Sequence, residues 1–312
     1  MTTNDIPSVA ATEELANAGE RDSHRAESHQ VGRRDFIGGS AIAAAAILGN
    51  DVSAAQTEPA AEEAPRKKTF LVVEGHMDDA EIGAGGVLIQ AAKAGHRVVI
   101  VTVASDYTTW AQTRGREDRT KIDLMEQAKS FGFEKRFLNG AYHQTSGSDL
   151  ELKRRLAEIY VELKPDVTFI SHHEDHWPDH SGSAIAAKDA FLFSHGLSSD
   201  MRPYRAPLIF AFGVTPVQTY HFEPDAFYDV TDVMHEYMDL IARVEAIRTG
   251  HSLSQEIKYE FKTLAGNSPT LRLSPHGMVR FAEAIRWGDQ SGCRFAIGFK
   301  TVWGDRRGPA LF

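Results

Sequence analysis

The sequence predicts an α/β fold, in which a mainly parallel sheet carries helices on both faces. Short, continuous apolar runs alternate along the chain with longer segments whose apolar residues recur every three or four positions. Continuous runs are typical of strands buried on both faces, and their alternation with helices is typical of parallel sheets. With 312 residues, 42% of them hydrophobic, the chain is long enough for one large domain.

The predicted strands are the four continuous apolar runs, at residues 69–73, 97–103, 166–170 and 207–212. Helices are predicted from apolar spacing together with capping residues, because glycine and proline end helices and Ser-Pro begins them. The predicted helices span residues 83–94, a segment that ends before Pro165, residues 231–250, and a segment from Pro275 to about Gly288.

The composition narrows the functional classes. Lys and Arg total 34 against 43 Asp and Glu, a net charge of −9, and no basic stripe offsets it. Nucleic acid is therefore not an expected partner. Cys293 is the sole cysteine, which excludes an intramolecular disulfide and a cysteine-rich zinc site. Any metal site would have to use histidine and carboxylate ligands.

The amino terminus is predicted to be an export signal. Arg33 and Arg34 precede a Gly/Ala-rich apolar run at residues 38–49, which is too short to span a bilayer stably. This pattern resembles a twin-arginine signal, with small residues suited to cleavage before Ala55. The alternative is a buried, alanine-rich helix. We therefore expect an exported protein with a signal region at 1–54, a linker at 55–68 and one domain at 69–312, without a stable membrane span.

Two loops that follow predicted strands are rich in ionisable residues. Residues 74–81 contain a histidine and four acids, and residues 171–180 contain four of the 14 histidines. In parallel sheets the loops at the carboxyl ends of strands carry the chemistry. The glycines at 83–86 do not have dinucleotide-fingerprint spacing, and the acids beside them would repel a pyrophosphate.

These loops predict a metal site. His76 and Asp79 can converge on one cation, and the second loop can supply a third ligand, while Asp78 is placed to accept a proton from water. Three such ligands leave coordination positions open, as in catalytic zinc sites and, less often, iron(II) sites. Taken alone, either loop is equally consistent with a solvated turn.

Several segments resemble one enzyme family. Residues 76–86 resemble the H-P-D-D-A-E-x-G-x-G-G element of the LmbE-like/PIG-L N-acetylglucosaminyl deacetylases, and residues 178–180 resemble the end of its H-P-D-H element. Weaker similarities lie at 246–252 and 281–284. The resemblance extends from about Phe70 to Trp287.

The resemblance implies a Rossmann-like fold and one zinc ion per chain, with another divalent ion as the alternative. The ligands would be His76, Asp79 and His180, and Asp78 would be the general base that later returns the proton to the amine. The implied reaction is hydrolysis of an N-acetyl amide on an amino sugar or a glucosamine-containing conjugate.

The chain departs from the family pattern at two places. Met77 replaces a proline, and Trp177 replaces the first histidine of the H-P-D-H element. His176, one place earlier, is the candidate to take over that catalytic role, and Trp177 is a candidate to stack on a sugar ring. Arg119 is a further candidate for substrate binding. The loss of a catalytic histidine leaves two other functions open: a metal hydrolase acting on a non-sugar amide, and a catalytically impaired metal- or glycan-binding protein.

Overall fold

Strands and helices alternate through most of the domain. The computed structural model describes residues 66–197, 208–216, 218–261, 270–304 and 311. The predicted signal region and most of the predicted linker lie outside these residues. The elements are β1 (Thr69–Glu74), α1 (Asp79–Lys93), β2 (Arg97–Asp106), α2 (Glu117–Ser130), β3 (Phe133–Ala141), α3 (Leu150–Leu163), β4 (Val167–Ser171), α4 (Pro178–Leu197), β5 (Leu208–Phe212), β6 (Ala226–Asp229), η1 (Thr231–Val233), α5 (Met234–Thr249), α6 (Leu253–Glu256), β7 (Tyr259–Phe261), β8 (Leu271–Leu273), α7 (Pro275–Ser291) and β9 (Ala296–Trp303).

The main sheet of the described chain is mostly parallel, as predicted. Its strand order is β3-β2-β1-β4-β5-β9-β6. The first five strands in this order, β3, β2, β1, β4 and β5, run parallel to one another. Strand β9 pairs antiparallel with both β5 and β6. Strand β1 pairs with β2 on one side and β4 on the other, so Val72 lies between Ile100 and Phe169.

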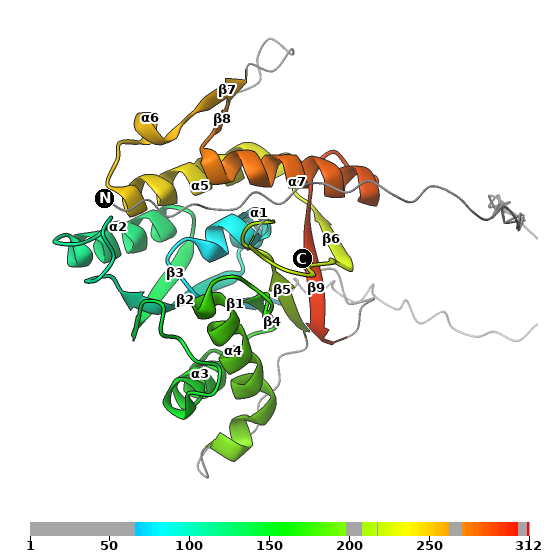
Figure 1. The fold of residues 1–312 in the computed structure, drawn as a ribbon. Coiled ribbons are helices and arrows are strands. Elements are labelled where there is room, and N and C mark those ends of the chain that lie inside the picture. The colour runs from blue at the N-terminus through cyan, green and yellow to red at the C-terminus, as the bar shows by residue number, and fades with distance from the viewer. Residues whose placement is uncertain (1–65, 198–207, 217, 262–269, 305–310, 312) are drawn as a thin grey trace, which may run out of the picture. The chain divides into compact units, whose positions relative to one another are not determined.

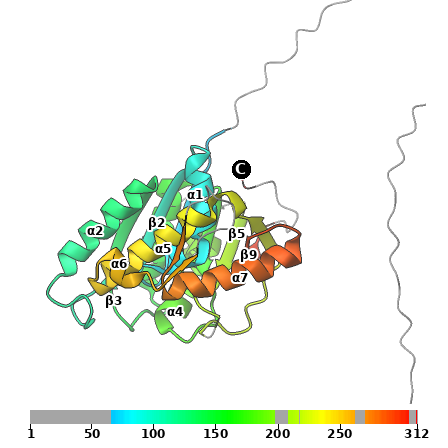
Figure 2. The same ribbon diagram turned by 90° about the horizontal axis from the view of Figure 1, so that it is seen from above.

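Helices cover both faces of this sheet (Figures 1 and 2). Phe70 and Val72 of β1 belong to the core beneath α1, α5 and α7. Leu71 and Val73 belong to the core beneath α3 and α4. Because both faces of each central strand are buried, both sets of alternating side chains are apolar, which explains the continuous apolar runs. None of the helices within the described ranges has the length and apolar character of a membrane-spanning segment.

Helix α1 begins at Asp79, four residues before the predicted start at Gly83. Its first turn therefore contains acidic residues that were predicted to lie in a loop. At the first turn of a helix the helix dipole favours negative charge. A Cβ atom at Gly83 would lie 2.1 Å from Cδ2 of Phe212. This glycine lets α1 pack closely against β5, a structural role that agrees with the rejection of a phosphate-binding motif.

A buried ion cluster lies beneath the loop between β1 and α1. The ammonium group of Lys135, on β3, is 2.9 Å from Glu74 and 2.8 Å from Glu81, and all three side chains are fully buried. It also donates a hydrogen bond to the carbonyl oxygen of Met77 at 2.6 Å. Burial raises the pKa of both glutamates, and the two carboxylates raise the pKa of Lys135 against the effect of its own burial. Lys135 therefore joins β3 to the loop.

We expect Lys135→Met to destabilise the protein by about 3 kcal/mol, because it leaves two buried carboxylates without a cation. Lys129→Met, at an exposed position on α2, is the matched control and should change stability by less than about 0.5 kcal/mol. Urea unfolding of the two variants measures the difference. Equal stability of both variants would show that the cluster contributes nothing to the fold.

Candidate metal centre

The two ionisable loops meet at the carboxyl edge of the sheet. They follow β1 and β4, which are adjacent parallel strands. The second loop runs into α4, so His180 lies in the first turn of that helix. A Cβ atom at Gly75 would lie 2.9 Å from Cδ2 of His180 and 3.0 Å from the backbone of Asp179. A glycine at this position therefore allows the loop after β1 to approach the start of α4.

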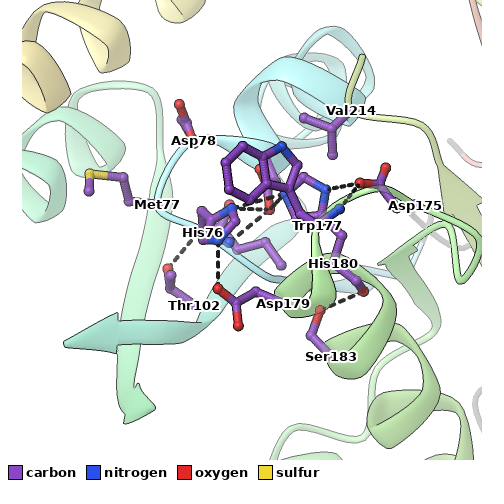
Figure 3. Close-up of polar contacts among 12 residues, drawn as sticks. His76, Met77, Asp78, Thr102, Asp175, Trp177, Asp179, His180, Ser183 and Val214 are labelled. Atoms are coloured by element: carbon purple, nitrogen blue, oxygen red, sulfur yellow. Dashed lines mark hydrogen bonds and ion pairs between the residues drawn. The ribbon is translucent and has the colours of Figure 1, made fainter. Parts of the chain in front are cut away.

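The side chains of His76, Asp79 and His180, all buried, converge at this point, and Figure 3 labels the two histidines. Nδ1 of His76 lies 2.9 Å from Nε2 of His180. Oδ2 of Asp79 lies 3.1 Å from Nε2 of His180 and 3.9 Å from Nδ1 of His76. The structure therefore brings together the ligand set that the family resemblance implies.

Each imidazole ring is hydrogen-bonded to a carboxylate through its outer nitrogen, the one that faces away from the shared point. Nε2 of His76 lies 2.8 Å from Asp179, and Nδ1 of His180 lies 2.9 Å from Asp175. Asp179 also accepts hydrogen bonds from the backbone N–H groups of His143 and Thr145. Each carboxylate accepts the outer N–H of its ring, which leaves the inner nitrogen to face the shared point.

The electrostatics of the site follow from these contacts. Burial alone would raise the pKa of Asp79, but His180 and His76 outweigh it and lower that pKa. Burial would lower the pKa of His180, whereas Asp79 and Asp175 raise it to about 10. In the metal-free protein a proton is therefore held among the inner ligand atoms, and a metal ion has to displace it.

The donor set fits a divalent metal ion. Two imidazole nitrogens and one carboxylate oxygen suit zinc and its neighbours in the first transition row. Ligand atoms bonded tetrahedrally to zinc lie roughly 3.3 Å apart. The three separations of 2.9, 3.1 and 3.9 Å bracket that value. Two inner nitrogens that face each other need either a shared proton or a cation between them.

A cavity of about 230 Å³ opens beside the three ligands. Aromatic side chains line part of it: Tyr142 stacks on Trp110 with ring centroids 5.1 Å apart, and Trp177 lies 5.9 Å from the ring of His76. Its remaining lining residues are Asp78, Ile82, Val214, Thr215, Gln218, Arg248 and His276. The cavity therefore combines an apolar aromatic surface with polar and charged groups near the metal ligands.

Asp78, the predicted general base, lies in this cavity but points away from His76 (Figure 3). Its Oδ2 lies 3.1 Å from Nε of Arg248, a residue of α5. The guanidinium of Arg248 is held by a hydrogen bond to Gln112 and lies 5.8 Å from the ring of Trp110. Asp78 is thus beside the ligands and is oriented by an arginine from a distant part of the chain.

The other predicted site residues lie in different places. Trp177 lines the cavity, as its predicted contact with a sugar requires. The structure does not bring His176 into the cavity lining: its side chain is exposed and lies 3.4 Å from the hydroxyl of Tyr220. Arg119 is 68% exposed on α2 and forms an ion pair with Asp123, so the structure gives it no contact with the cavity.

Three residues near the site, Arg248, Glu245 and His276, are not predicted by the sequence patterns. Arg248 and Glu245 come from α5 and His276 from the first turn of α7, far along the chain from the two loops. The weak resemblances at residues 246–252 and 281–284 are the signals that lie near them in the sequence. They could not show that Arg248 and His276 line the cavity beside the metal ligands.

Comparison with known proteins supports the family resemblance. Residues 71–191 match the family model described as PIG-L: GlcNAc-PI de-N-acetylase. The diacetylchitobiose deacetylase of Thermococcus kodakarensis is 26% identical over 255 residues, which cover 76% of this chain and 84% of that relative. The prediction of a hydrolytic enzyme related to the LmbE-like/PIG-L deacetylases is confirmed by these matches.

Solved structures confirm the fold class. The N,N'-diacetylchitobiose deacetylase of Pyrococcus horikoshii has a TM-score of 0.58 at 21% identity, covering 78% of this chain and 87% of its own. GalB, the 4-carboxy-2-hydroxymuconate hydratase of Pseudomonas putida, has a TM-score of 0.55 at 19% identity, covering 78% of this chain and 98% of its own. At these identities the likeness concerns the fold alone.

We expect Asp175→Ala to weaken zinc binding by about 10- to 100-fold, because the ring of His180 loses the carboxylate that orients it. Glu174→Ala is the matched control, since Glu174 lies in the same loop but pairs with His221 at the surface. Competition with a chromogenic chelator measures both affinities. Unchanged zinc affinity in Asp175→Ala would contradict the role assigned to this carboxylate.

Proposed function

We propose that this chain, which carries a PIG-L family domain over residues 71–191, is a zinc-dependent hydrolase that removes an N-acyl group from an amino sugar or a glucosamine-containing conjugate. The observation that carries the proposal is the convergence of His76, Asp79 and His180 at the wall of a cavity that also contains Asp78. The deacetylase activity of the curated relative supports the reaction type.

The residues of the chain have distinct parts in this reaction. His76, Asp79 and His180 would hold the metal ion. A metal ion bound there would act as a Lewis acid and lower the pKa of water. Asp78 accepts the proton that the attacking water loses. Arg248 keeps the Asp78 side chain in the cavity through their ion pair. Asp175 and Asp179 keep the two rings in the orientation that presents their inner nitrogens.

The cavity lining suits a sugar. The indole ring of Trp177, which lines the cavity, is a surface on which the apolar side of a pyranose can pack, and the stacked rings of Trp110 and Tyr142 line the cavity as well. Thr215 and Gln218 supply hydrogen-bonding groups for hydroxyls. Burial, together with the nearby aspartates, raises the pKa of Tyr142 to about 12, so its hydroxyl is a hydrogen-bond donor at neutral pH.

Trp177 favours a second candidate function, a metal- and glycan-binding protein with impaired catalysis. An indole N–H can donate a hydrogen bond but cannot act as an acid or a base near neutral pH, whereas the family has a histidine at this position. Loss of one transition-state donor costs on the order of 100-fold in rate. Turnover measurements distinguish this candidate from the enzyme.

We expect the zinc-loaded protein to release acetate from N,N'-diacetylchitobiose or N-acetylglucosamine. Asp78→Asn should lower kcat by about 10²- to 10⁴-fold, because it removes the group that accepts the proton of water. Asp239→Asn, at an aspartate of α5 that pairs with Arg243, is the control and should retain activity. A zinc-loaded protein that binds these sugars but releases no acetate would favour the binding protein instead.

We also propose that the protein is exported through its twin-arginine signal, which the pattern around residues 33–54 supports. In a bacterium with this export system, the full chain should be found in the exported fraction. Replacing the pair by Arg33→Lys and Arg34→Lys should retain the protein in the cytoplasm, as judged by cell fractionation. Equal export of the two forms would contradict a twin-arginine signal.

A further inference from the structure

A third histidine lines the cavity. Besides the ligands His76 and His180, the described lining contains the imidazole of His276, from the first turn of α7. We propose that His276, held by Glu245, is the acid that protonates the departing amine. This inference rests on the proposed deacetylase function and assigns one of its proton transfers to a residue outside the two motif loops.

A buried carboxylate orients the ring of His276. Nδ1 of His276 lies 2.5 Å from Oε1 of Glu245, whose side chain is 1% exposed, while the His276 side chain is 30% exposed. Because Nδ1 is engaged by the carboxylate, Nε2 is the ring nitrogen available for proton transfer in the cavity. This is the arrangement of an acid–base histidine fixed by a carboxylate.

The surroundings of His276 favour its charged form. Burial lowers its pKa, but the hydrogen bond and charge of Glu245, together with the charge of Asp78, outweigh burial and the opposing charge of Arg248. The pKa is therefore raised above the ordinary value for histidine. A protonated imidazole at near-neutral pH is the form that a proton donor requires.

The proposed amide hydrolysis needs no reactant other than the amide and water. Asp78 takes one proton from the attacking water as the carbon–oxygen bond forms. When the carbon–nitrogen bond breaks, its electron pair stays on nitrogen, and the proton on Nε2 of His276 moves to that nitrogen. The amine and the carboxylic acid leave, Asp78 releases its proton to solvent, and His276 regains one from solvent.

The acid and the base have different direct partners. Asp78 lies 3.1 Å from Arg248, and His276 of α7 lies 2.5 Å from Glu245. Because Arg248 is also 3.8 Å from Glu245 on α5, the two groups belong to one chain of charged contacts. The indole N–H of Trp177 does not release its proton near neutral pH, and the ring of His176 lies outside the cavity lining. Among the histidines of the described cavity lining, His276 is thus the one that is not a proposed metal ligand.

The test compares an amide with an ester. Acetate release from N,N'-diacetylchitobiose requires protonation of the amine, whereas 4-nitrophenyl acetate has a leaving group that departs as an anion. We expect His276→Gln to lower kcat/KM by about 100-fold for the amide and by less than about threefold for the ester. Asp78→Asn should impair both reactions, because both need an activated water.

His251→Gln is the matched control. Its ring forms the same kind of pair, with Nδ1 2.6 Å from Oε1 of Glu256, but lies outside the described cavity lining. It should leave both activities unchanged. Circular dichroism and zinc content establish that His276→Gln is folded and loaded, and His276→Asn provides a second variant if it is not.

An independent readout is the titration of His276 followed by NMR in the metal-free protein, with the resonance assigned by its absence in His276→Gln. Glu245→Gln should lower this pKa, because it removes the carboxylate that favours the charged ring. Glu256→Gln should leave it unchanged.

Three results would overturn the assignment. Equal losses on amide and ester would assign His276 to stabilisation of the oxyanion. An unchanged amide rate in His276→Gln, with wild-type acetate release intact, would remove His276 from the reaction and leave the proposed function standing. If the wild type releases no acetate from any N-acetyl sugar, the proposed function fails and the assignment falls with it.

Discussion

Two imidazole rings, each tied from behind to a buried carboxylate, are the constraint on which the site depends. Asp179 and Asp175 occupy the outer nitrogens of His76 and His180, so the inner nitrogens face each other beside Asp79. Such an arrangement is costly without a proton or a cation between the nitrogens. The fold supports it by placing the two loops on adjacent parallel strands.

The buried ion cluster beneath the first loop also helps to position the metal ligands. Lys135 neutralises part of the charge of Glu74 and Glu81 and holds the carbonyl of Met77, at the position where the family has a proline. A proline would restrict the backbone of this loop through its ring. In this chain a hydrogen bond to a buried ammonium group restrains the same residue, so the loop is held by tertiary contacts.

The cavity distributes its charges in pairs. Asp78 is paired with Arg248, and His276 with Glu245, which lies one helical turn from Arg248 on α5. Arg248, Glu245 and His276 come from α5 and α7, whereas Asp78 and the metal ligands come from the two loops and the helix starts that follow them. The proposed chemistry therefore joins a metal site and a base built at the strand ends to an acid built by α5 and α7.

The sequence by itself determined the fold class, the strands β1, β2, β4 and β5, and the ligand-bearing loops, because continuous apolar runs and dense ionisable clusters are local patterns. It did not reveal β3, β6, β9 or α4, whose apolar residues are sparse or interrupted, and it began α1 four residues late because the acids at 78–81 are typical of a metal-binding loop. Only the tertiary structure decided which histidines reach the cavity: His276 does, and the sequence-adjacent His176 does not. Spacing along a chain cannot show which face of a loop turns inward, since that depends on how distant helices pack against the sheet.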